Sequence, residues 1–333
     1  MRAMVLEEIG IIESSPLRMV ERPMPQPGPH EVRVRVTRCA ICRTDLHVIE
    51  GELPRQKIPI IPGHQIVGYV DALGPDVRHL RLGERVGVAW LRHTCGTCGF
   101  CRSARENLCE RARFTGYHAD GGYAEYALVP ENFAYALPAV FSDSDAAPLL
   151  CAGIIGYRAL KRCNLPPNGK LALFGFGSSA HVVLQIARHR GCEVYVVSRA
   201  TSHVALAHSL GAEWASTEAA SLPVRVDSAI IFAPAGELVP VALEHLNKGG
   251  TLALAGIYMT AIPALDYERH LFYERNVHSV TANTRSDARE LLVEAAQIPL
   301  RPTVTEYPLA EANRALQDLK ADRINGTGVL VIS

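Results

Sequence analysis

Four closely spaced cysteines constrain this chain more than any other feature. Cys95, Cys98, Cys101 and Cys109 follow the spacing C-x2-C-x2-C-x7-C. Zn²⁺ binds such all-sulfur sets as a closed tetrahedron that leaves no position for a substrate. Disulfides and reduced thiols without a ligand are the alternatives, but paired C-x2-C steps favour metal in a chain without an export signal. The motif therefore predicts a structural zinc site.

Charge and hydrophobicity exclude some classes of partner. The 333 residues include 34 basic and 34 acidic side chains, so there is no net formal charge to attract nucleic acid or an anionic membrane. No apolar run approaches the ~20 residues of a membrane-spanning helix, and the first residues lack the apolar core of a secretory signal. Nine cysteines without such a signal favour a reducing compartment. We therefore expect a cytoplasmic protein, long enough for two domains.

The two halves of the chain differ in pattern. Up to about residue 150, short strands such as 31–36 and 83–88 lie among Pro- and Gly-rich turns, which is typical of a β-rich domain. Later, strands are expected at 170–174, 193–197, 227–232 and 251–255. Helical spacing covers 181–190, and a second helix is expected to end near Gly211. This alternation predicts an α/β fold with a doubly wound, mostly parallel sheet.

A glycine-rich turn joins the strand at 170–174 to the helix that follows. Gly175 permits a tight turn, Gly177 allows close approach of a pyrophosphate, and Ala180 supplies the small residue needed for helix–strand packing. Ser178 and Ser179 belong to this turn, ahead of a helix whose free N–H groups and positive dipole end favour phosphate. The order strand, turn, helix therefore predicts a dinucleotide site.

The end of the next strand bears on which dinucleotide binds. An acidic residue there would bind the ribose hydroxyls of NAD, but this chain has Ser198 and Arg199. Ser198 can hydrogen-bond a 2′-phosphate, and Arg199 can pair with it through charge-assisted hydrogen bonds. A solvated arginine without a ligand is the alternative. The loop therefore favours NADP(H) over NAD(H).

Three further segments carry candidate ligands that spacing alone does not single out: CRTDLH at 42–47, PGHQIVG at 62–68 and APLLCAG at 147–153. With the four cysteines and the turn GFGSSA at 175–180, they occur in one order over nearly the whole chain. The chain resembles the zinc-dependent alcohol dehydrogenases of the medium-chain dehydrogenase/reductase superfamily. The resemblance implies a catalytic zinc held by Cys42, His64 and Cys151 with one open position, and therefore two zinc ions per chain.

The resemblance also implies roles for the neighbours of these ligands. Thr44 would hydrogen-bond the substrate oxygen bound to the catalytic zinc. His47 would stand at the solvent end of a proton relay through Thr44 and the nicotinamide ribose. Asp45 would orient the ring of His64.

One position departs from the family pattern. Gln65 stands where members commonly carry glutamate directly after the histidine ligand, so a carboxylate that exchanges onto the metal is not expected here. The remaining cysteines match no ligand position of the family: Cys39, Cys163 and Cys192.

For the cofactor and substrate, the resemblance implies further contacts. Arg285 would contact the pyrophosphate, and four residues would line the nicotinamide: Phe232, Ala233, Gly256 and Ile257. Trp90 would form a wall of the substrate pocket, and Leu53 and Ile49 stand where small-alcohol members tend to carry larger aromatic residues. This predicts primary aliphatic or aromatic alcohols and their aldehydes as substrates, with ordinary core positions as the alternative interpretation of these residues.

The implied fold combines a Rossmann doubly wound parallel sheet with a GroES-like β-rich catalytic domain. We expect the GroES-like domain at 1–150, the Rossmann domain at 151–285, and a C-terminal segment at 286–333 that returns to the catalytic domain. Members are usually homodimers or homotetramers. The implied reaction is hydride transfer between NAD(P)(H) and an alcohol or aldehyde. A zinc-free quinone or enoyl reductase and a non-catalytic zinc- and nucleotide-binding protein are the alternatives, and the complete ligand set disfavours the first.

Overall fold

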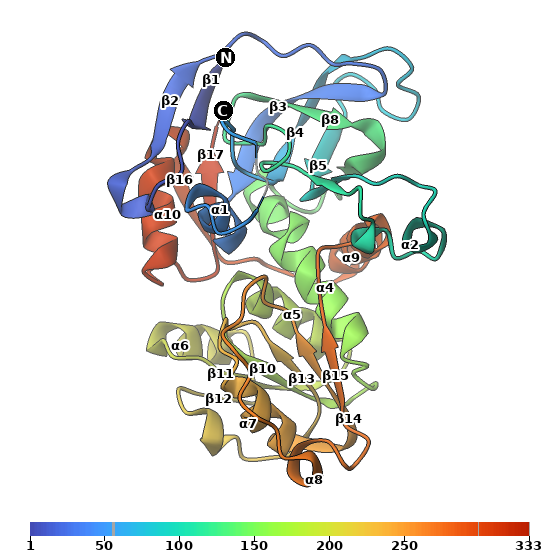
Figure 1. Cartoon of the computed structure of the whole chain (residues 1–333), viewed down its shortest axis with the longest axis vertical. Coiled ribbons are helices and arrows are strands. Elements are labelled where there is room, and N and C mark those ends of the chain that lie inside the picture. The colour runs from blue at the N-terminus through green and yellow to red at the C-terminus, as the bar shows by residue number, and fades with distance from the viewer. Residues whose placement is uncertain (55–56, 299, 333) are drawn as a thin grey trace. The chain divides into compact units, whose positions relative to one another are not determined.

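A computed structural model of the chain describes residues 1–54, 57–298 and 300–332 (Figure 1). Its contacts divide the chain into two compact units. The first comprises Met1–Cys151, Ala282–Ala296 and Pro302–Ser333, and the second comprises Ala152–Thr281 and Gln297–Arg301. The chain thus forms most of the first unit, then the second, and returns to complete the first.

The first unit is built on a β-sheet. Within the described residues its strands run in the order β16-β17-β3-β4-β5-β9, and β8 also pairs with β3. Along β3 the valines are buried while Arg33 and Arg35 between them reach the surface, which is the alternation that the sequence predicts at 31–36. The strand continues to Ala40, so it leads directly into the segment that carries Cys42.

The strands of this unit are β1 (Arg2–Leu6), β2 (Leu17–Glu21), β3 (Glu31–Ala40), β4 (Gln65–Leu73), β5 (Arg85–Val88), β6 (Leu91–His93), β7 (Arg113–Phe114), β8 (Tyr126–Pro130), β9 (Ala134–Ala136), β16 (Val304–Pro308) and β17 (Thr327–Val331). Its helices are α1 (Arg43–Ile49), α2 (Gly99–Arg102), α3 (Asp143–Ala146), α9 (Arg285–Gln297) and α10 (Ala312–Lys320). Short 3-10 helices lie at η1 (Ile12–Ser14), η2 (Glu106–Leu108), η3 (Glu131–Phe133), η4 (Ala147–Leu150) and η6 (Leu309–Glu311).

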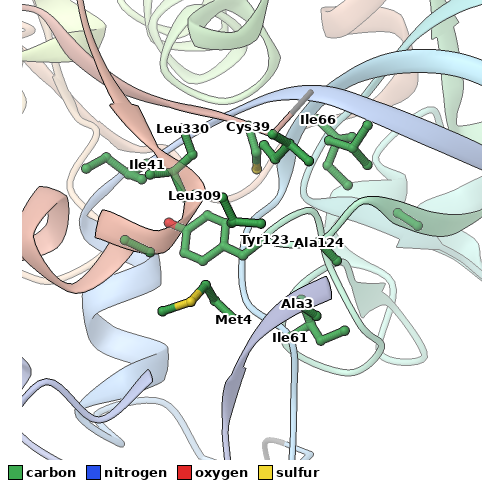
Figure 2. Packing of buried hydrophobic residues seen from close by; sticks show 14 of the residues in the cluster. Ala3, Met4, Cys39, Ile41, Ile61, Ile66, Tyr123, Ala124, Leu309 and Leu330 are labelled. Carbon is green, nitrogen blue, oxygen red and sulfur yellow. The ribbon is translucent and has the colours of Figure 1, made fainter. Parts of the chain in front are cut away.

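A hydrophobic core joins distant segments of this unit. Figure 2 shows the ring of Tyr123 among Met4 from β1, Leu309 from η6 and Leu330 from β17. Tyr123 has no exposed surface. Burying one large apolar side chain contributes about 1.5–3 kcal/mol, so this cluster ties the C-terminal strands to the N-terminal part of the unit.

The second unit contains a parallel sheet. In the described part of the chain its order is β12-β11-β10-β13-β14-β15, and each neighbouring pair is parallel. Numbered along the chain, this is the order 3-2-1-4-5-6 of the Rossmann fold. The expected fold class, a Rossmann sheet with a separate β-rich domain, is confirmed.

The elements of the second unit lie close to the ranges that the sequence predicts. Its strands are β10 (Lys170–Phe174), β11 (Glu193–Val197), β12 (Trp214–Ser216), β13 (Val226–Ile231), β14 (Leu246–Leu254) and β15 (Asn276–Ser279). Its helices are α4 (Ala152–Arg162), α5 (Ser178–His189), α6 (Thr201–Ser209), α7 (Leu238–His245), α8 (Tyr267–His270) and the 3-10 helix η5 (Ala219–Ser221). Helix α5 begins three residues earlier than its apolar spacing indicates, because the glycine turn ends at Gly177. None of the helices in the described ranges has the length and apolar character that a bilayer crossing requires.

Candidate active site and metal centres

Three predicted ligands from separate segments of the first unit converge. Cys42 directly precedes α1, His64 directly precedes β4, and Cys151 follows η4. Their ligand atoms all lie within 4.8 Å of one another, and Cys42 Sγ lies 3.3 Å from His64 Nε2. His64 is fully buried and the two cysteines are half-buried. Two sulfurs and one imidazole nitrogen around a single point form a donor set that suits zinc with a further coordination position.

Asp45 holds two of these residues in place. Its Oδ2 accepts a hydrogen bond from the backbone N–H of Cys42 at 2.9 Å, which forms a capping box at the start of α1. Its Oδ1 lies 3.0 Å from His64 Nδ1. Because the carboxylate engages Nδ1, the Nε2 atom of His64 is the one directed at Cys42. These contacts favour the orienting role that the family resemblance implies for Asp45.

The ionisation of this cluster follows from its burial and mutual contacts. The pKa of Cys42 lies well below its ordinary value because the Cys151 thiol donates a hydrogen bond to it, and nearby His64 acts in the same direction against burial. Burial alone would lower the pKa of His64, but Cys42 and Asp45 raise it to about 10. The residues thus favour a thiolate beside a protonated imidazole, and a bound metal ion would displace that proton.

A tight turn positions His64. The preceding Gly63 has φ +93°, and a Cβ atom there would lie 2.3 Å from Tyr123 Cδ1 and 2.9 Å from Cys39 Sγ. A Cβ atom on Gly121 would lie 2.0 Å from the Gly63 oxygen. The turn is therefore packed against its neighbours without space for a side chain, so only glycine fits. Tyr123 is a positioning residue that the sequence patterns do not reveal.

Gln65 is buried beside this turn. It has no exposed surface, and neither its Oε1 nor its Nε2 has a hydrogen-bond partner among the described residues. A buried amide without partners costs free energy unless water or a ligand satisfies it. The residue that departs from the family pattern is thus also a polar group with unused hydrogen-bonding capacity, directly after a candidate ligand.

The predicted proton-transfer residues lie along α1. Thr44 is buried and its backbone N–H donates to Cys42 Sγ at 3.3 Å. His47, three residues later, lies on the same face of the helix. Nδ1 of His47 is hydrogen-bonded to the carboxylate of Glu52, and the Glu52 backbone N–H donates to the His47 carbonyl at 2.9 Å. Glu52 is a further candidate residue, which no motif marks because the loop after the helix brings it back.

The residues predicted for the substrate pocket lie in different surroundings. The ring centroid of Trp90 is 6.2 Å from that of His64 and 4.0 Å from that of Phe114, on which it stacks. Ile49 is fully buried in the hydrophobic core, and Leu53 packs against the same core while partly exposed. Of the three, Trp90 therefore lies beside the candidate metal ligands.

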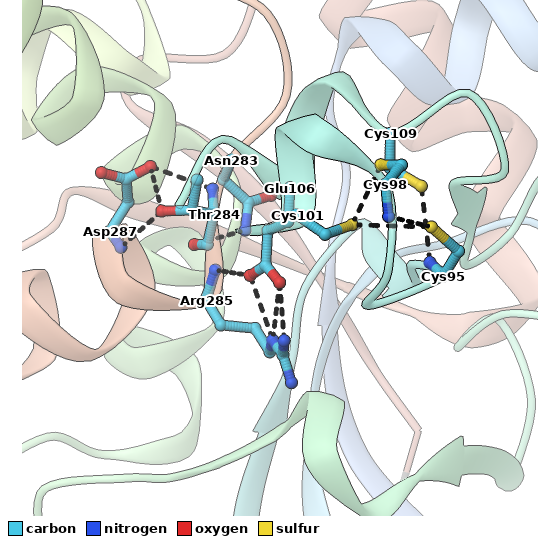
Figure 3. A network of polar contacts seen from close by, with 9 residues as sticks. All are labelled: Cys95, Cys98, Cys101, Glu106, Cys109, Asn283, Thr284, Arg285 and Asp287. Atoms are coloured by element: carbon cyan, nitrogen blue, oxygen red, sulfur yellow. Dashed lines mark hydrogen bonds and ion pairs between the residues drawn. The ribbon is translucent and has the colours of Figure 1, made fainter. Parts of the chain in front are cut away.

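The four predicted structural ligands also converge, in the four-cysteine lobe, which we define as residues 95–109. Their sulfur atoms lie within 4.8 Å of one another (Figure 3). Cys98 Sγ lies 3.5 Å from Cys101 Sγ, and Cys95 Sγ accepts the backbone N–H of Cys98 at 3.3 Å. Backbone N–H groups of Thr97 and Cys98 lower the pKa of Cys95 to about 5, which favours the thiolate that a metal requires.

Arg285 begins α9 in the first unit. Its guanidinium and its backbone N–H both donate hydrogen bonds to the carboxylate of Glu106. The shortest of these contacts is from Nη2 to Oε2, at 2.6 Å. The guanidinium also lies 4.8 Å above the ring of Phe133. Arg285, predicted from the resemblance to contact a pyrophosphate, is thus held by an acidic residue of the four-cysteine lobe.

The predicted dinucleotide turn lies between β10 and α5. Gly175 has φ +90°, and a Cβ atom there would lie 2.8 Å from the backbone nitrogen of Ala233. A Cβ atom on Gly177 would meet no atom within 4 Å, so packing does not explain that glycine. Ala180 is fully buried. A glycine facing open space at a helix N-terminus is what close approach of a phosphate requires.

A polar contact between Ser198 and His203 lies directly after the end of β11. Ser198 Oγ lies 3.2 Å from Nδ1 of His203, while Arg199 is exposed. Nε2 of His203 is buried without a hydrogen-bond partner in the part of the chain that the structure describes. No side chain caps the N-terminus of α6 at Ala200, so its first N–H groups and His203 offer donors there. His203, like Tyr123 and Glu52, is a residue that sequence reasoning missed.

The residues predicted along the nicotinamide follow two strands. Phe232 and Ala233 come directly after β13, and their N–H groups donate to the Phe174 carbonyl at 2.8 and 3.2 Å. Gly256 and Ile257 follow β14, and Ile257 is exposed. All follow the carboxyl ends of parallel strands, the edge at which such sheets bind ligands.

Comparisons with known proteins agree with this geometry. Residues 28–139 match the alcohol dehydrogenase GroES-like domain, and residues 180–297 match the zinc-binding dehydrogenase family. The chain is 51% identical over 337 residues to a probable alcohol dehydrogenase, AdhA, of Mycobacterium tuberculosis, covering 100% of this chain and 97% of that protein. It is 33% identical over 345 residues to an alcohol dehydrogenase of Geobacillus stearothermophilus, with both chains covered completely.

Solved structures give the same result. A cobalt- and zinc-bound thermostable alcohol dehydrogenase from Pyrobaculum aerophilum superposes with a TM-score of 0.89 at 29% identity, covering 100% of this chain and 99% of that chain. The matched families and the two cysteine clusters together indicate a dehydrogenase of the zinc-binding class. The chain belongs to the zinc-dependent alcohol dehydrogenase family of the medium-chain dehydrogenase/reductase superfamily, and it is an oxidoreductase of that type. The family predicted from the sequence motifs is confirmed.

Proposed function

We propose that this protein is a zinc-dependent alcohol dehydrogenase, or aldehyde reductase, that transfers a hydride between NAD(P)(H) and a primary alcohol or its aldehyde. The observation that carries the proposal is the convergence of Cys42, His64 and Cys151 within 4.8 Å, with Asp45 on the far nitrogen of the histidine. A zinc-free reductase would not require these three metal ligands, so the donor set disfavours that alternative.

The residues fit one zinc ion in each cysteine cluster. Cys42, His64 and Cys151 would hold the catalytic ion, and the four cysteines of the lobe would hold the structural ion. When bound, catalytic zinc supplies Lewis acidity that polarises the substrate oxygen. Closed four-sulfur coordination excludes the lobe from the reaction, so the chemistry belongs to the three-residue site.

The chain's own residues would move the proton. The Thr44 hydroxyl would accept the proton of an alcohol and pass it outward along α1 to His47. The Glu52 carboxylate is hydrogen-bonded to Nδ1 of His47 and would orient its ring for this transfer. In the direction of aldehyde reduction the same residues would return the proton.

We propose NADP(H) as the preferred cofactor. Arg199 and Ser198 would bind the 2′-phosphate, and the buried Nε2 atom of His203 supplies a further donor or acceptor beside them. The pyrophosphate would approach the open face of Gly177 at the start of α5, beside Ser178, Ser179 and Ala180.

Further cofactor contacts are proposed for the residues that the family resemblance implies. The contacts of Arg285 with Glu106 use its backbone N–H, Nε and Nη2, which among the described residues leaves Nη1 for the pyrophosphate. The residues proposed to line the nicotinamide are Phe232, Ala233, Gly256 and Ile257.

Aromatic alcohols and aldehydes are the proposed substrates, with aliphatic ones as the second class. Trp90 stacks on Phe114, whose ring lies 5.6 Å from that of His118, so an aromatic row extends from the metal ligands. Such faces favour planar groups beside the reacting carbon. The apolar Leu53 supports accommodation of more than the smallest alcohols.

We also propose a homodimer or homotetramer. Among the described residues, β15 is an edge strand of the second unit's sheet, and Val277 on it is 38% exposed. Phe272 and Tyr267 nearby are 54% and 66% exposed. Exposed apolar side chains beside an unpaired strand edge favour self-association. The cytoplasm is the proposed location, supported by nine described cysteines that are all free thiols.

The test is a comparison of initial rates. Zinc-loaded protein would be assayed for NADPH and NADH oxidation against one panel of aromatic and aliphatic aldehydes. The proposal expects faster oxidation of NADPH and highest rates with aromatic aldehydes. His64→Ala should abolish turnover while NADP(H) binding persists. Retained turnover in that variant would overturn the assignment of the catalytic site, and faster NADH oxidation would overturn the cofactor preference.

A further inference from the structure

Glu106 connects the four-cysteine lobe to a distant helix. The residue begins η2, between Cys101 and Cys109, and is only 8% exposed. Its carboxylate reaches Arg285, the first residue of α9, which is 179 residues later in the chain (Figure 3). The lobe thus contributes a buried acidic side chain to an element outside itself.

The contact between the two residues is multiple and directional. Oε1 accepts the backbone N–H of Arg285 at 2.8 Å and its Nε at 3.0 Å. Oε2 accepts Nε at 3.1 Å and Nη2 at 2.6 Å. The backbone contact satisfies an N–H that a helix N-terminus leaves open, and the negative charge suits the positive dipole end. Glu106 is therefore a cap for α9 that is supplied from another segment.

The helix has its own cap beside this one. Asp287 Oδ2 accepts the backbone N–H of Thr284 at 2.9 Å and its hydroxyl at 2.8 Å, and the Asp287 N–H donates back to the hydroxyl at 3.1 Å. Both residues are buried. The hydrogen bonds between Thr284 and Asp287 fix the start of α9, and Glu106 fixes where this start lies within the first unit.

The lobe has little else to hold it. Most residues between its cysteines are exposed, among them Thr97, Arg102 and Arg105. A segment with so few buried apolar side chains depends on its ligands for a fixed conformation. The position of Glu106 therefore depends on Cys101 and Cys109 on either side of it.

We propose that metal in the four-cysteine lobe is coupled through Glu106 to the first turn of α9. Metal that fixes the cysteines holds the Glu106 carboxylate on Arg285, at the point where the chain re-enters the first unit after Thr281. By linkage, a docked α9 in turn strengthens metal binding in the lobe. The inference rests on zinc in the lobe, which is part of the proposed function.

The test measures amide hydrogen exchange in the first turn of α9 in a cycle of two substitutions. Cys98→Ser removes one of the four lobe ligands but keeps Cys101 and Cys109, which flank Glu106. Glu106→Gln removes the charge of the cap while preserving its shape. Cys98→Ser should lower the zinc content from two to one per chain and speed exchange at the start of α9 about tenfold or more. Glu106→Gln should do the same with both zinc ions present. Exchange in the double variant should be little faster than in either single variant, because both substitutions break the same connection between the lobe and α9.

Matched controls separate this coupling from general damage. Cys192→Ser removes a buried thiol of the second unit, and Glu110→Gln removes an exposed carboxylate directly after the lobe. Neither should change exchange in α9. If Glu106→Gln does not fold, Arg285→Lys, which keeps the charge but not the fork of donors, should show a smaller increase in exchange.

Two results separate failure of the inference from failure of the proposed function. Loss of the lobe zinc in Cys98→Ser without faster exchange in α9 would overturn the coupling and leave the zinc assignment intact. Additive effects in the double variant would also overturn it. A zinc content of one per chain in both the wild type and Cys98→Ser would instead show that the lobe holds no zinc, and the coupling and the zinc assignment of the lobe would both fail.

Discussion

The carboxylate of Asp45 lies 3.0 Å from Nδ1 of His64, and both side chains are 2% exposed. A buried carboxylate at this distance fixes the orientation of the imidazole ring and increases its basicity. Because the same carboxylate also accepts the N–H of Cys42, one side chain positions two candidate ligands from different segments.

Asp45→Asn should weaken metal binding at the three-residue site about 10- to 100-fold, because an amide neither stabilises nor orients the ring as a carboxylate does. Competition with a chelator, followed by zinc analysis, measures this. Asp71→Asn on β4, which removes a surface carboxylate paired with Arg33, is the control and should leave zinc affinity unchanged. Equal affinity in both variants would contradict the role given to Asp45.

Gly63→Ala should destabilise the protein by about 3 kcal/mol or more, because the new Cβ atom would collide with Tyr123 in a left-handed backbone conformation. Gly83→Ala isolates the backbone cost: Gly83 has φ +80°, but a Cβ atom there meets no atom within 4 Å. That variant should lose only about 1 kcal/mol. Urea unfolding compares the two, and a similar loss in both would show that the contact with Tyr123 is unimportant.

His47→Gln should lower kcat for alcohol oxidation about 100-fold with little change in KM, since it removes the proposed proton acceptor rather than a binding contact. Glu52→Gln should lower kcat by a smaller factor, about tenfold, because the imidazole remains but loses its carboxylate partner. The exposed Glu8→Gln serves as the control. If Glu52→Gln has wild-type kcat, the hydrogen bond to His47 plays no part in proton transfer.

Arg199→Asp should lower the ratio of NADPH to NADH efficiency (kcat/KM) by at least about tenfold, because it replaces a phosphate partner by a repelling charge. His203→Leu should shift the ratio in the same direction by a smaller factor, since it removes the ring that lies beside Ser198. His208→Gln, an exposed change on the same helix, should have no effect. An unchanged ratio in Arg199→Asp would mean that this loop does not distinguish the two cofactors.

His181 predicts a pH dependence of stability. Burial lowers the pKa of His181 to about 4, against 6.5 for an unperturbed histidine. Above pH 6.5 the ring is neutral in both the folded and the unfolded states and contributes no dependence. As the pH falls from 6.5 to 4, only the unfolded chain binds the proton, so the free energy of unfolding decreases by about 3 kcal/mol in total.

The comparison of wild type with His181→Gln measures this contribution. As the pH falls from 6.5 to 4, the free energy of unfolding of the variant should decrease less steeply than that of the wild type. The reason is that the variant lacks the one proton that His181 takes up on unfolding. His208→Gln on the neighbouring helix is exposed, so its slope should match that of the wild type. Parallel slopes for His181→Gln and wild type would contradict the burial argument.

The parts of this molecule that could be predicted are those whose partners are close in sequence or fixed by a regular element. The four cysteines of the lobe share one short segment, and Gly175 and Gly177 follow a recognisable strand and precede a helix. Cys42, His64 and Cys151 lie far apart, so only the combination of family motifs identified them. Their shared geometry became visible in the fold.

Other site residues could not be predicted because loops, not periodic elements, decide their contacts. Glu52 returns to His47 through the turn after α1, and His203 meets Ser198 where β11 passes into α6. Tyr123 reaches Gly63 only through the packing of two loops. Glu106 meets Arg285 across 179 residues, a separation over which sequence pattern carries no information about contact.

The two cysteine clusters differ in how much of the chain they need. All ligands of the lobe lie between residues 95 and 109, whereas the other cluster requires Cys42, His64 and Cys151 together in a folded unit. During synthesis, a chain can therefore close the lobe on an ion before Cys151 has been made. The site proposed for chemistry must wait until the surrounding sheet has formed, so the spacing of the ligands would let the lobe bind its proposed ion first.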